Sequence, residues 1–140
     1  MMSGKQLGFC GYRCDLCPAF MENIDRLTDR TTLRKAWNHF FGFDVPEERI
    51  ICVGCAEIGN HLDTDCPVRP CALRNQVQDC SSCALFESCG TLRLRADILD
   101  EVKKNYHGTI SKEEYQLFFR PYEGRNELEK QKKKRKSHGV

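Results

Sequence analysis

The chain has 140 residues and a formal net charge of +2, and 40% of its residues are hydrophobic and 30% charged. This is the balance of an ordinary soluble domain, and the length excludes a barrel enzyme, which needs about 200 residues or more. No apolar run reaches the roughly 20 residues of a membrane-spanning helix, which excludes a membrane protein of that kind. Residues 1–8 lack the apolar core of a signal peptide, so we expect a cytoplasmic protein.

Positive charge is concentrated at the C-terminal end. Residues 130–140 hold six Lys and Arg residues and no acid, so residues 1–129 carry a net charge of −4. The body therefore lacks the basic composition that is typical of a nucleic-acid-binding domain. Because runs of like charge are usually solvated, residues 126–140 are predicted to be a disordered basic tail. Its attraction to phosphate leaves weak contact with nucleic acid as an alternative role.

Apolar periodicity predicts about four helices, in a mainly helical fold with little or no sheet. The first covers residues 25–41, where apolar residues recur every three or four positions, and Gly42 follows as a stop. We interpret its aromatic face as hydrophobic core. The second is expected over residues 66–77, with two prolines in its first turn, where missing amide protons cost nothing.

Two further helices are predicted after the last cysteine. One covers residues 91–106. The other begins with a capping box, Ser111 and Glu114, and should stop before Pro121. Residues 1–125 are therefore expected to form a single domain, with a cysteine-rich, metal-binding head at 8–90 and a helical extension at 91–123.

The cysteines are the strongest chemical signal in the chain, because most of them stand in close pairs. They are Cys10, Cys14, Cys17, Cys52, Cys55, Cys66, Cys71, Cys80, Cys83 and Cys89. Disulfides are rare in a reducing cytosol, where paired cysteines more often bind metal. Two Cys-x-x-Cys pairs make one tetrahedral site, with zinc about 2.3 Å from each sulfur. The sequence therefore predicts two zinc ions per chain.

The spacing favours two groups of four ligands. The first group is Cys14, Cys17, Cys52 and Cys55, and the second is Cys66, Cys71, Cys80 and Cys83. This grouping leaves out Cys10 and Cys89. Spacing does not rank the alternatives in which Cys10 replaces Cys14, or Cys89 replaces Cys66 or Cys71. Further candidate ligands are His39 and His61.

The opening cluster also fits a different cofactor. Cys10, Cys14 and Cys17 have the spacing that holds an iron–sulfur cluster in radical enzymes that use S-adenosylmethionine. Those enzymes need a partial or full barrel, for which the chain is too short, and the other seven cysteines would have no role. Thiolates also bind other iron–sulfur clusters, which therefore remain the second choice of cofactor.

Enzymatic activity is not favoured by these motifs, and no catalytic residue is assigned. The pair Cys80 and Cys83 could act as a thiol-exchange site, but the strand expected before such a motif is absent from the pattern. Zinc catalysis needs an open coordination position, and sites made of four cysteines are usually closed.

The ordered set of motifs resembles a known family. Residues 10–18 read CGYRCDLCP, residues 52–55 CVGC, residues 66–72 CPVRPCA and residues 80–83 CSSC, with Cys89 behind them. This order is similar to that of a small cysteine-rich bacterial and archaeal family catalogued as a domain of unknown function. The resemblance covers residues 8–90 and implies metal binding by the ten cysteines, with no established activity. Members often have a cysteine where this chain has Asp63, so a carboxylate ligand is a further alternative.

We therefore expect a zinc-stapled helical domain that serves as a structural or adaptor module for a protein partner. The alternative is a thiol or iron–sulfur redox protein.

Overall fold

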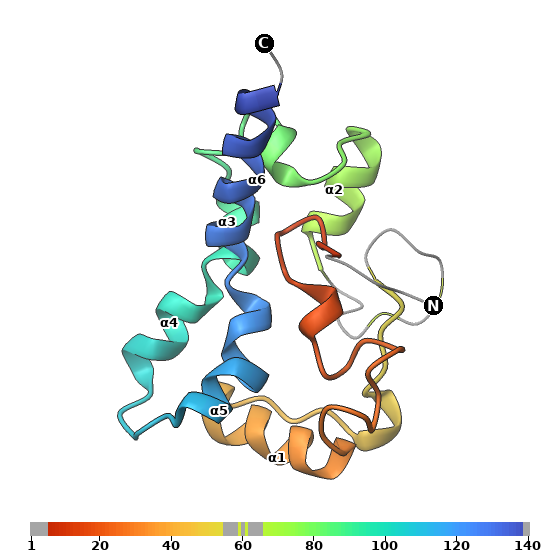
Figure 1. Ribbon diagram of the computed structural model, residues 1–140, viewed down its shortest axis with the longest axis vertical. Helices are drawn as coiled ribbons and strands as arrows, with labels where there is room; N and C mark the ends of the chain where they lie inside the picture. Colours follow the sequence, from red (N-terminus) through yellow and green to blue (C-terminus); the bar gives the residue numbers. More distant parts are fainter. Residues whose placement is uncertain (1–5, 55–58, 60, 62–65, 139–140) are drawn as a thin grey trace.

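The computed structural model describes residues 6–54, 59, 61 and 66–138, so Cys55 and Asp63 lie outside the described residues. The α-helices in this part of the chain are α1 (Arg30–Phe41), α2 (Val68–Arg74), α3 (Gly90–Ala96), α4 (Ile98–Asn105), α5 (Lys112–Glu114) and α6 (Gly124–His138). Two isolated bridges, and no strands, occur in the described ranges. The prediction of a mainly helical fold is confirmed. Figure 1 shows α1 across one end of the molecule and α6 running toward the other.

Helix α1 ends where the sequence predicted and begins five residues later. Asp29 caps it, since its carboxylate accepts a hydrogen bond from the Thr32 amide at 2.6 Å. Gly42 closes it with a φ of +84°, in the left-handed region that glycine adopts without strain. The expected aromatic face is buried, with Trp37 only 1% exposed.

Helix α2 is shorter than the predicted residues 66–77. Pro67 precedes its first residue, as expected for a proline at a helix start. At its end the Cys71 carbonyl accepts two hydrogen bonds from Asn75, one from the backbone amide at 3.0 Å and one from the side chain at 2.8 Å. Gln76 follows with a φ of +56°, which ends the helix.

The helix predicted over residues 91–106 is two helices, α3 and α4, separated by Asp97. Two long-range contacts hold this break. Arg125 donates two hydrogen bonds to the Asp97 carboxylate, each 3.0 Å long. The Tyr12 hydroxyl donates to the Arg95 carbonyl at 2.8 Å, which provides a partner outside the helix.

The predicted capping box is confirmed, because Ser111 and Glu114 exchange side chain to backbone hydrogen bonds. The helix after it differs from the prediction. Helix α5 passes into a π-helical turn at Tyr115–Phe119 and then a 3-10 turn at Arg120–Tyr122. These turns bury Phe119, which is 0% exposed, against α1.

Two apolar clusters make up the core. One surrounds α1 and contains Ala19, Leu33, Trp37, Phe40, Ile50, Leu99, Phe118, Phe119 and Tyr122. The other lies among α2, α3 and α6 and contains Phe9, Cys10, Cys66, Val68, Ala72, Phe86, Leu92, Ala96 and Leu128. Tyr12 packs against both clusters, so the N-terminal segment lies where they meet.

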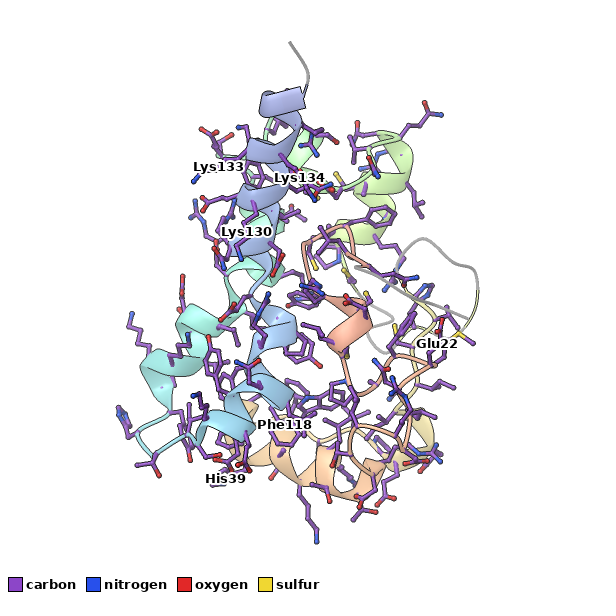
Figure 2. All side chains as sticks on the ribbon, viewed as in Figure 1. Glu22, His39, Phe118, Lys130, Lys133 and Lys134 are labelled. Atoms are coloured by element: carbon purple, nitrogen blue, oxygen red, sulfur yellow. The ribbon has the colours of Figure 1, made fainter. Side chains whose placement is uncertain are left out.

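Helix α6 occupies residues for which the sequence predicted a disordered tail from 126 onward. Leu128 and Glu127 are 0% and 1% exposed, so the first half of α6 is part of the core. The prediction missed this because a single apolar residue in a charged run carries no periodicity. The basic character of the exposed face is as expected, and Figure 2 shows Lys130, Lys133 and Lys134 along α6.

Glu127 is a buried acid with charged partners. One of its oxygens lies 2.5 Å from the Arg120 guanidinium and 3.8 Å from that of Arg13. Arg13 also pairs with Asp15 at 2.6 Å. A buried carboxylate requires such compensation, and here the partners come from the first cysteine motif and from the turn before α6.

Two basic residues of α6 contact the cysteine-rich head. Arg135 donates to the Ser81 hydroxyl at 2.6 Å, and Lys132 pairs with Glu87 at 2.5 Å. These contacts dock α6 on the third cysteine motif. No helix among the described residues is long and apolar enough to cross a bilayer.

Candidate metal centre

The first Cys-x-x-Cys motif folds as a tight turn. Cys14–Leu16 form a 3-10 turn, and the Cys17 amide donates to the Cys14 carbonyl at 3.2 Å. The buried Asn23 side chain binds the carbonyls of Asp15 and Cys17 at 3.0 and 2.9 Å. The backbone of the motif is therefore fixed by the turn hydrogen bond and by the two hydrogen bonds from Asn23.

Gly11 allows this motif to approach α6. Its φ is +93°, and a Cβ atom at this position would overlap the Gly124 carbonyl and lie 2.7 Å from Leu128 Cγ. A Cβ atom on Gly124 would in turn lie 2.5 Å from the Cys10 carbonyl oxygen. The two glycines thus let the backbones of both segments touch.

The second motif lies beside the first. The Cys52 amide donates to the Ala19 carbonyl at 2.9 Å, and the Met21 amide donates to the Cys52 carbonyl at 2.8 Å. These bonds form a short parallel bridge between Phe20 and Cys52. Cys17 and Cys52 are close enough for the charge of one thiolate to raise the pKa of the other.

The Cys17 thiol is buried beneath a phenol. Burial raises its pKa to about 11, against a lowering by the Tyr122 hydroxyl, 3.0 Å away, and by the amides of Ala19 and Phe20. Burial and the adjacent thiol also raise the pKa of Tyr122, and either the phenol or the thiol can be the donor in the hydrogen bond between them. Sequence reasoning missed Tyr122, which stands 105 positions from Cys17 and has no motif of its own.

The third motif is a second tight turn. Cys80–Ser82 form a 3-10 turn capped by Asp79, which accepts from the Ser81 amide at 2.8 Å and from the Ser81 hydroxyl. The Cys83 amide donates to the Cys80 carbonyl at 3.2 Å, as in the first motif. The two Cys-x-x-Cys turns therefore share one backbone arrangement.

Three other thiols lie near that of Cys80. The pKa of Cys80 is raised to about 12, first by burial and then by the negative charges of Cys83, Cys89, Cys71 and Asp79, in that order. These cysteines come from α2, the third motif and the residue before α3. We call this set of four the Cys80 cluster.

Hydrogen-bond donors point at three of these sulfurs. The Leu92 amide lies 3.3 Å from Cys89 Sγ, which caps α3. The Leu85 amide lies 3.5 Å from Cys83 Sγ, and the Asn75 side-chain amide lies 3.5 Å from Cys71 Sγ. Such donors stabilise the thiolate form, which is the form that binds metal.

Cys89, which the first grouping left out, lies near Cys80. Cys66 is 9% exposed and packs in the apolar cluster beside Cys10, which is 3% exposed. By exposure of the whole residue, these are the only two of the nine described cysteines that are buried, and none of the nine forms a disulfide. Cys80 and Cys89 pack against the apolar cluster that contains Cys66, so the choice between Cys66 and Cys89 as a ligand stays a prediction.

The histidines have other contacts. The Nε2 atom of His39 lies 2.9 Å from the Tyr106 hydroxyl, and that of His61 lies 2.8 Å from the Gly54 carbonyl oxygen. Figure 2 shows His39 beside Phe118 at the α1 end of the molecule, away from Lys133 and Lys134. In the described ranges, no three or more His, Cys, Asp or Glu side chains are arranged so that they could hold a metal ion. The thiols of the Cys80 cluster are thus neighbours without the convergence of a formed site.

The fold and the grouped thiols define a small, mainly helical, cysteine-rich domain. Residues 6–94 match the model of a family described as "Protein of unknown function (DUF3795)", and the chain belongs to this family. The match spans all ten cysteines and ends within α3. No curated protein and no solved structure shows significant similarity to the chain.

Proposed function

We propose that this protein is a zinc-binding module in which two sites of four cysteines staple the helices, and that it serves as a structural or adaptor domain. The observation that carries the proposal is the Cys80 cluster. Three separate segments of the chain bring four thiols together there, with amide donors on three of the sulfurs. Four sulfur ligands are the donor set that structural zinc prefers.

The local chemistry suits a divalent cation. Neighbouring thiolates repel one another, and a bound Zn²⁺ ion would neutralise that charge as its ligands lose their protons. The side chains need a small inward movement to reach the Zn–S distance of about 2.3 Å. The exposed ends of Cys83 and Cys89 leave room for that movement, since neither side chain is fully buried.

The first site uses the ligands that the sequence predicted: Cys14, Cys17, Cys52 and Cys55. The bridge between Phe20 and Cys52 supports this grouping because it joins the two motifs through their backbones. The Tyr122 hydroxyl provides an outer contact that would orient one of the sulfur ligands.

A structural role, rather than a catalytic one, follows because each proposed site has four protein ligands. With four protein ligands zinc has no position for water, so neither site could activate a substrate. Structural zinc contributes about 10–16 kcal/mol in peptide systems, which equals or exceeds the roughly 5–15 kcal/mol stability of a typical domain. Metal loading would therefore decide whether the head is folded.

The test is metal analysis of protein purified without oxygen. We expect a colourless protein with about two zinc ions per chain. Cys89→Ser should lower the zinc content to about one ion, whereas Cys66→Ser, its matched control, should keep both. Loss of an equivalent in Cys66→Ser, with none lost in Cys89→Ser, would overturn the assignment of the second site. Protein without bound metal would overturn the proposed function.

The redox alternative has a distinct signature. If the purified protein were brown, absorbed visible light and contained iron, the cofactor would be an iron–sulfur cluster and not zinc. Thiol exchange is less favoured, because it requires an accessible thiolate, and burial raises the pKa values of Cys17 and Cys80 far above neutrality.

A further inference from the structure

The third cysteine motif is contacted by a residue that lies far beyond the end of the family match at residue 94. Arg135 of α6 donates a hydrogen bond to the Ser81 hydroxyl at 2.6 Å, and its guanidinium lies 3.9 Å from the Asp79 carboxylate. Asp79 and Ser81 stand on either side of Cys80 in the sequence. Arg135 therefore touches both neighbours of a proposed metal ligand.

Asp79 organises the backbone of the cysteine turn. Its carboxylate accepts hydrogen bonds from the amide and the hydroxyl of Ser81. Its carbonyl accepts hydrogen bonds from the amide and the hydroxyl of Ser82, at 3.1 and 2.8 Å. The shape of the turn, and with it the direction of the Cys80 and Cys83 side chains, thus depends on Asp79.

Burial makes the charge of Arg135 important to this turn. Asp79 and Ser81 are each 3% exposed, so little water can replace a partner that they lose. A buried carboxylate is stable only when positive charge and hydrogen bonds compensate for its lost hydration. If the guanidinium were removed, the carboxylate would keep only the donors of its own turn, and opening of the turn toward water would become more favourable.

Other basic residues fix α6 on the same loop. Arg125 and Lys132 lie on the face that carries Arg135, because they precede it by ten and three positions in a helix of about 3.6 residues per turn. The Phe86 ring centroid lies 5.1 Å from Arg125 Cζ and 5.2 Å from Lys132 Nζ. Phe86 belongs to the loop at residues 80–89, so Arg135 reaches the turn from a helix that is already held against it.

We propose that Arg135 is a positioning residue of the second metal site, which holds the turn of Cys80 and Cys83 in the form that binds metal. This inference deepens the proposed function and rests on it for the identity of the ion. It makes α6 the element that regulates how tightly this site holds its metal. The first site is an internal reference, since its motif meets α6 at Gly124, the opposite end of the helix.

The test compares thiol labelling in single variants of the full chain, with its metal as purified. Arg135→Gln removes the charge, Arg135→Lys keeps it, and Lys133→Gln removes an exposed charge two positions away (Figure 2). Each protein is treated with N-ethylmaleimide and a zinc chelator, sampled over time, digested with trypsin and analysed by mass spectrometry. Cleavage after Lys and Arg gives peptide 75–93 from the second site and peptide 14–26 from the first. One sample therefore reports both sites.

Arg135→Gln should speed the labelling of peptide 75–93 by about tenfold, the lower end of the effect that outer partners have on metal affinity. The labelling rate of peptide 14–26 should stay unchanged. Arg135→Lys should restore part of the native rate, because an ammonium group supplies the charge without the second N–H donor. Lys133→Gln should label like the native protein at both peptides. Thermal melts establish that each variant is folded.

Two results would overturn the inference. The first is equal labelling of peptide 75–93 in Arg135→Gln and Lys133→Gln, which leaves the proposed function intact if zinc is bound at both sites. The second is faster labelling of both peptides in Arg135→Gln, which would assign the residue to general stability. Native protein without zinc would refute the proposed function instead, whereas faster labelling confined to peptide 75–93 would still support the hold of Arg135 on the turn.

Discussion

Replacing Leu128 by alanine tests whether the basic C-terminal helix is a packed part of the domain. Leu128 is 0% exposed and lies in the apolar cluster that also contains Cys10 and Cys66. It packs against Gly11, the glycine of the first cysteine motif. Because alanine is at least as good a helix former as leucine, the substitution removes packing without weakening the helix itself.

The expected cost follows from the burial. Truncation of a fully buried leucine to alanine costs about 2–5 kcal/mol, through lost transfer energy and the cavity left behind. In a domain of this size each kcal/mol lowers the melting temperature by roughly 2–4 °C. Leu128→Ala should therefore melt roughly 5–20 °C below the native protein.

The matched control is Leu94→Ala. Leu94 is also in a helix, α3, but is 61% exposed. Its truncation should change stability by no more than about 0.5 kcal/mol, which corresponds to roughly 1–2 °C. Thermal unfolding followed by circular dichroism, at equal zinc content, measures both. If Leu128→Ala melted together with the Leu94→Ala control, the packing of α6 would be refuted.

Three further outcomes are expected. Glu127→Ala should lower the free energy of unfolding by about 3 kcal/mol, because it leaves two partly buried arginines without their carboxylate partner. Its control, Glu129→Ala on the exposed face, should be near neutral. Equal denaturation midpoints for the two variants would contradict the buried ion pairs. Gly11→Ala should lower the free energy of unfolding by at least about 1–3 kcal/mol, since the alanine would need a positive φ and its Cβ would clash. Gly90→Ala, with open space around the Cβ position, should be neutral or slightly stabilising in the same melts. Exhaustive chelation should reduce the helical circular dichroism signal and the melting temperature; metal-free protein with unchanged melting would argue against structural zinc.

Local chemistry made the helix ends predictable. Gly42 and the Ser111–Glu114 capping box each satisfy backbone groups within five residues along the chain, so their effect can be read directly from the sequence. The break at Asp97 could not be read in this way. It depends on Arg125 and Tyr12, which lie 28 and 85 positions away in the sequence and meet this turn only in the folded chain.

In the candidate site, too, some features are set by residues close in sequence and others by long-range packing. Pairing within a Cys-x-x-Cys turn is local, and both described turns have the expected compact form. Which other cysteine joins Cys80 depends on the packing of α2 against α3. That packing buries Cys66 in an apolar cluster and leaves Cys89 at the helix start, where its sulfur accepts an amide hydrogen bond.

The contact between Gly11 and Gly124 has a consequence for how the protein is made. The ribosome completes the cysteine motifs by residue 89, but the core beneath the first motif closes only when Leu128 is available. At about 5–20 residues per second, synthesis of the intervening 39 residues takes roughly 2–8 s. During that interval the cysteine motifs lack the packing that Leu128 provides. Zinc bound before α6 docks would protect the thiols that have left the ribosome, and in this chain the cysteine-rich segment acquires its final packing from residues beyond the matched region.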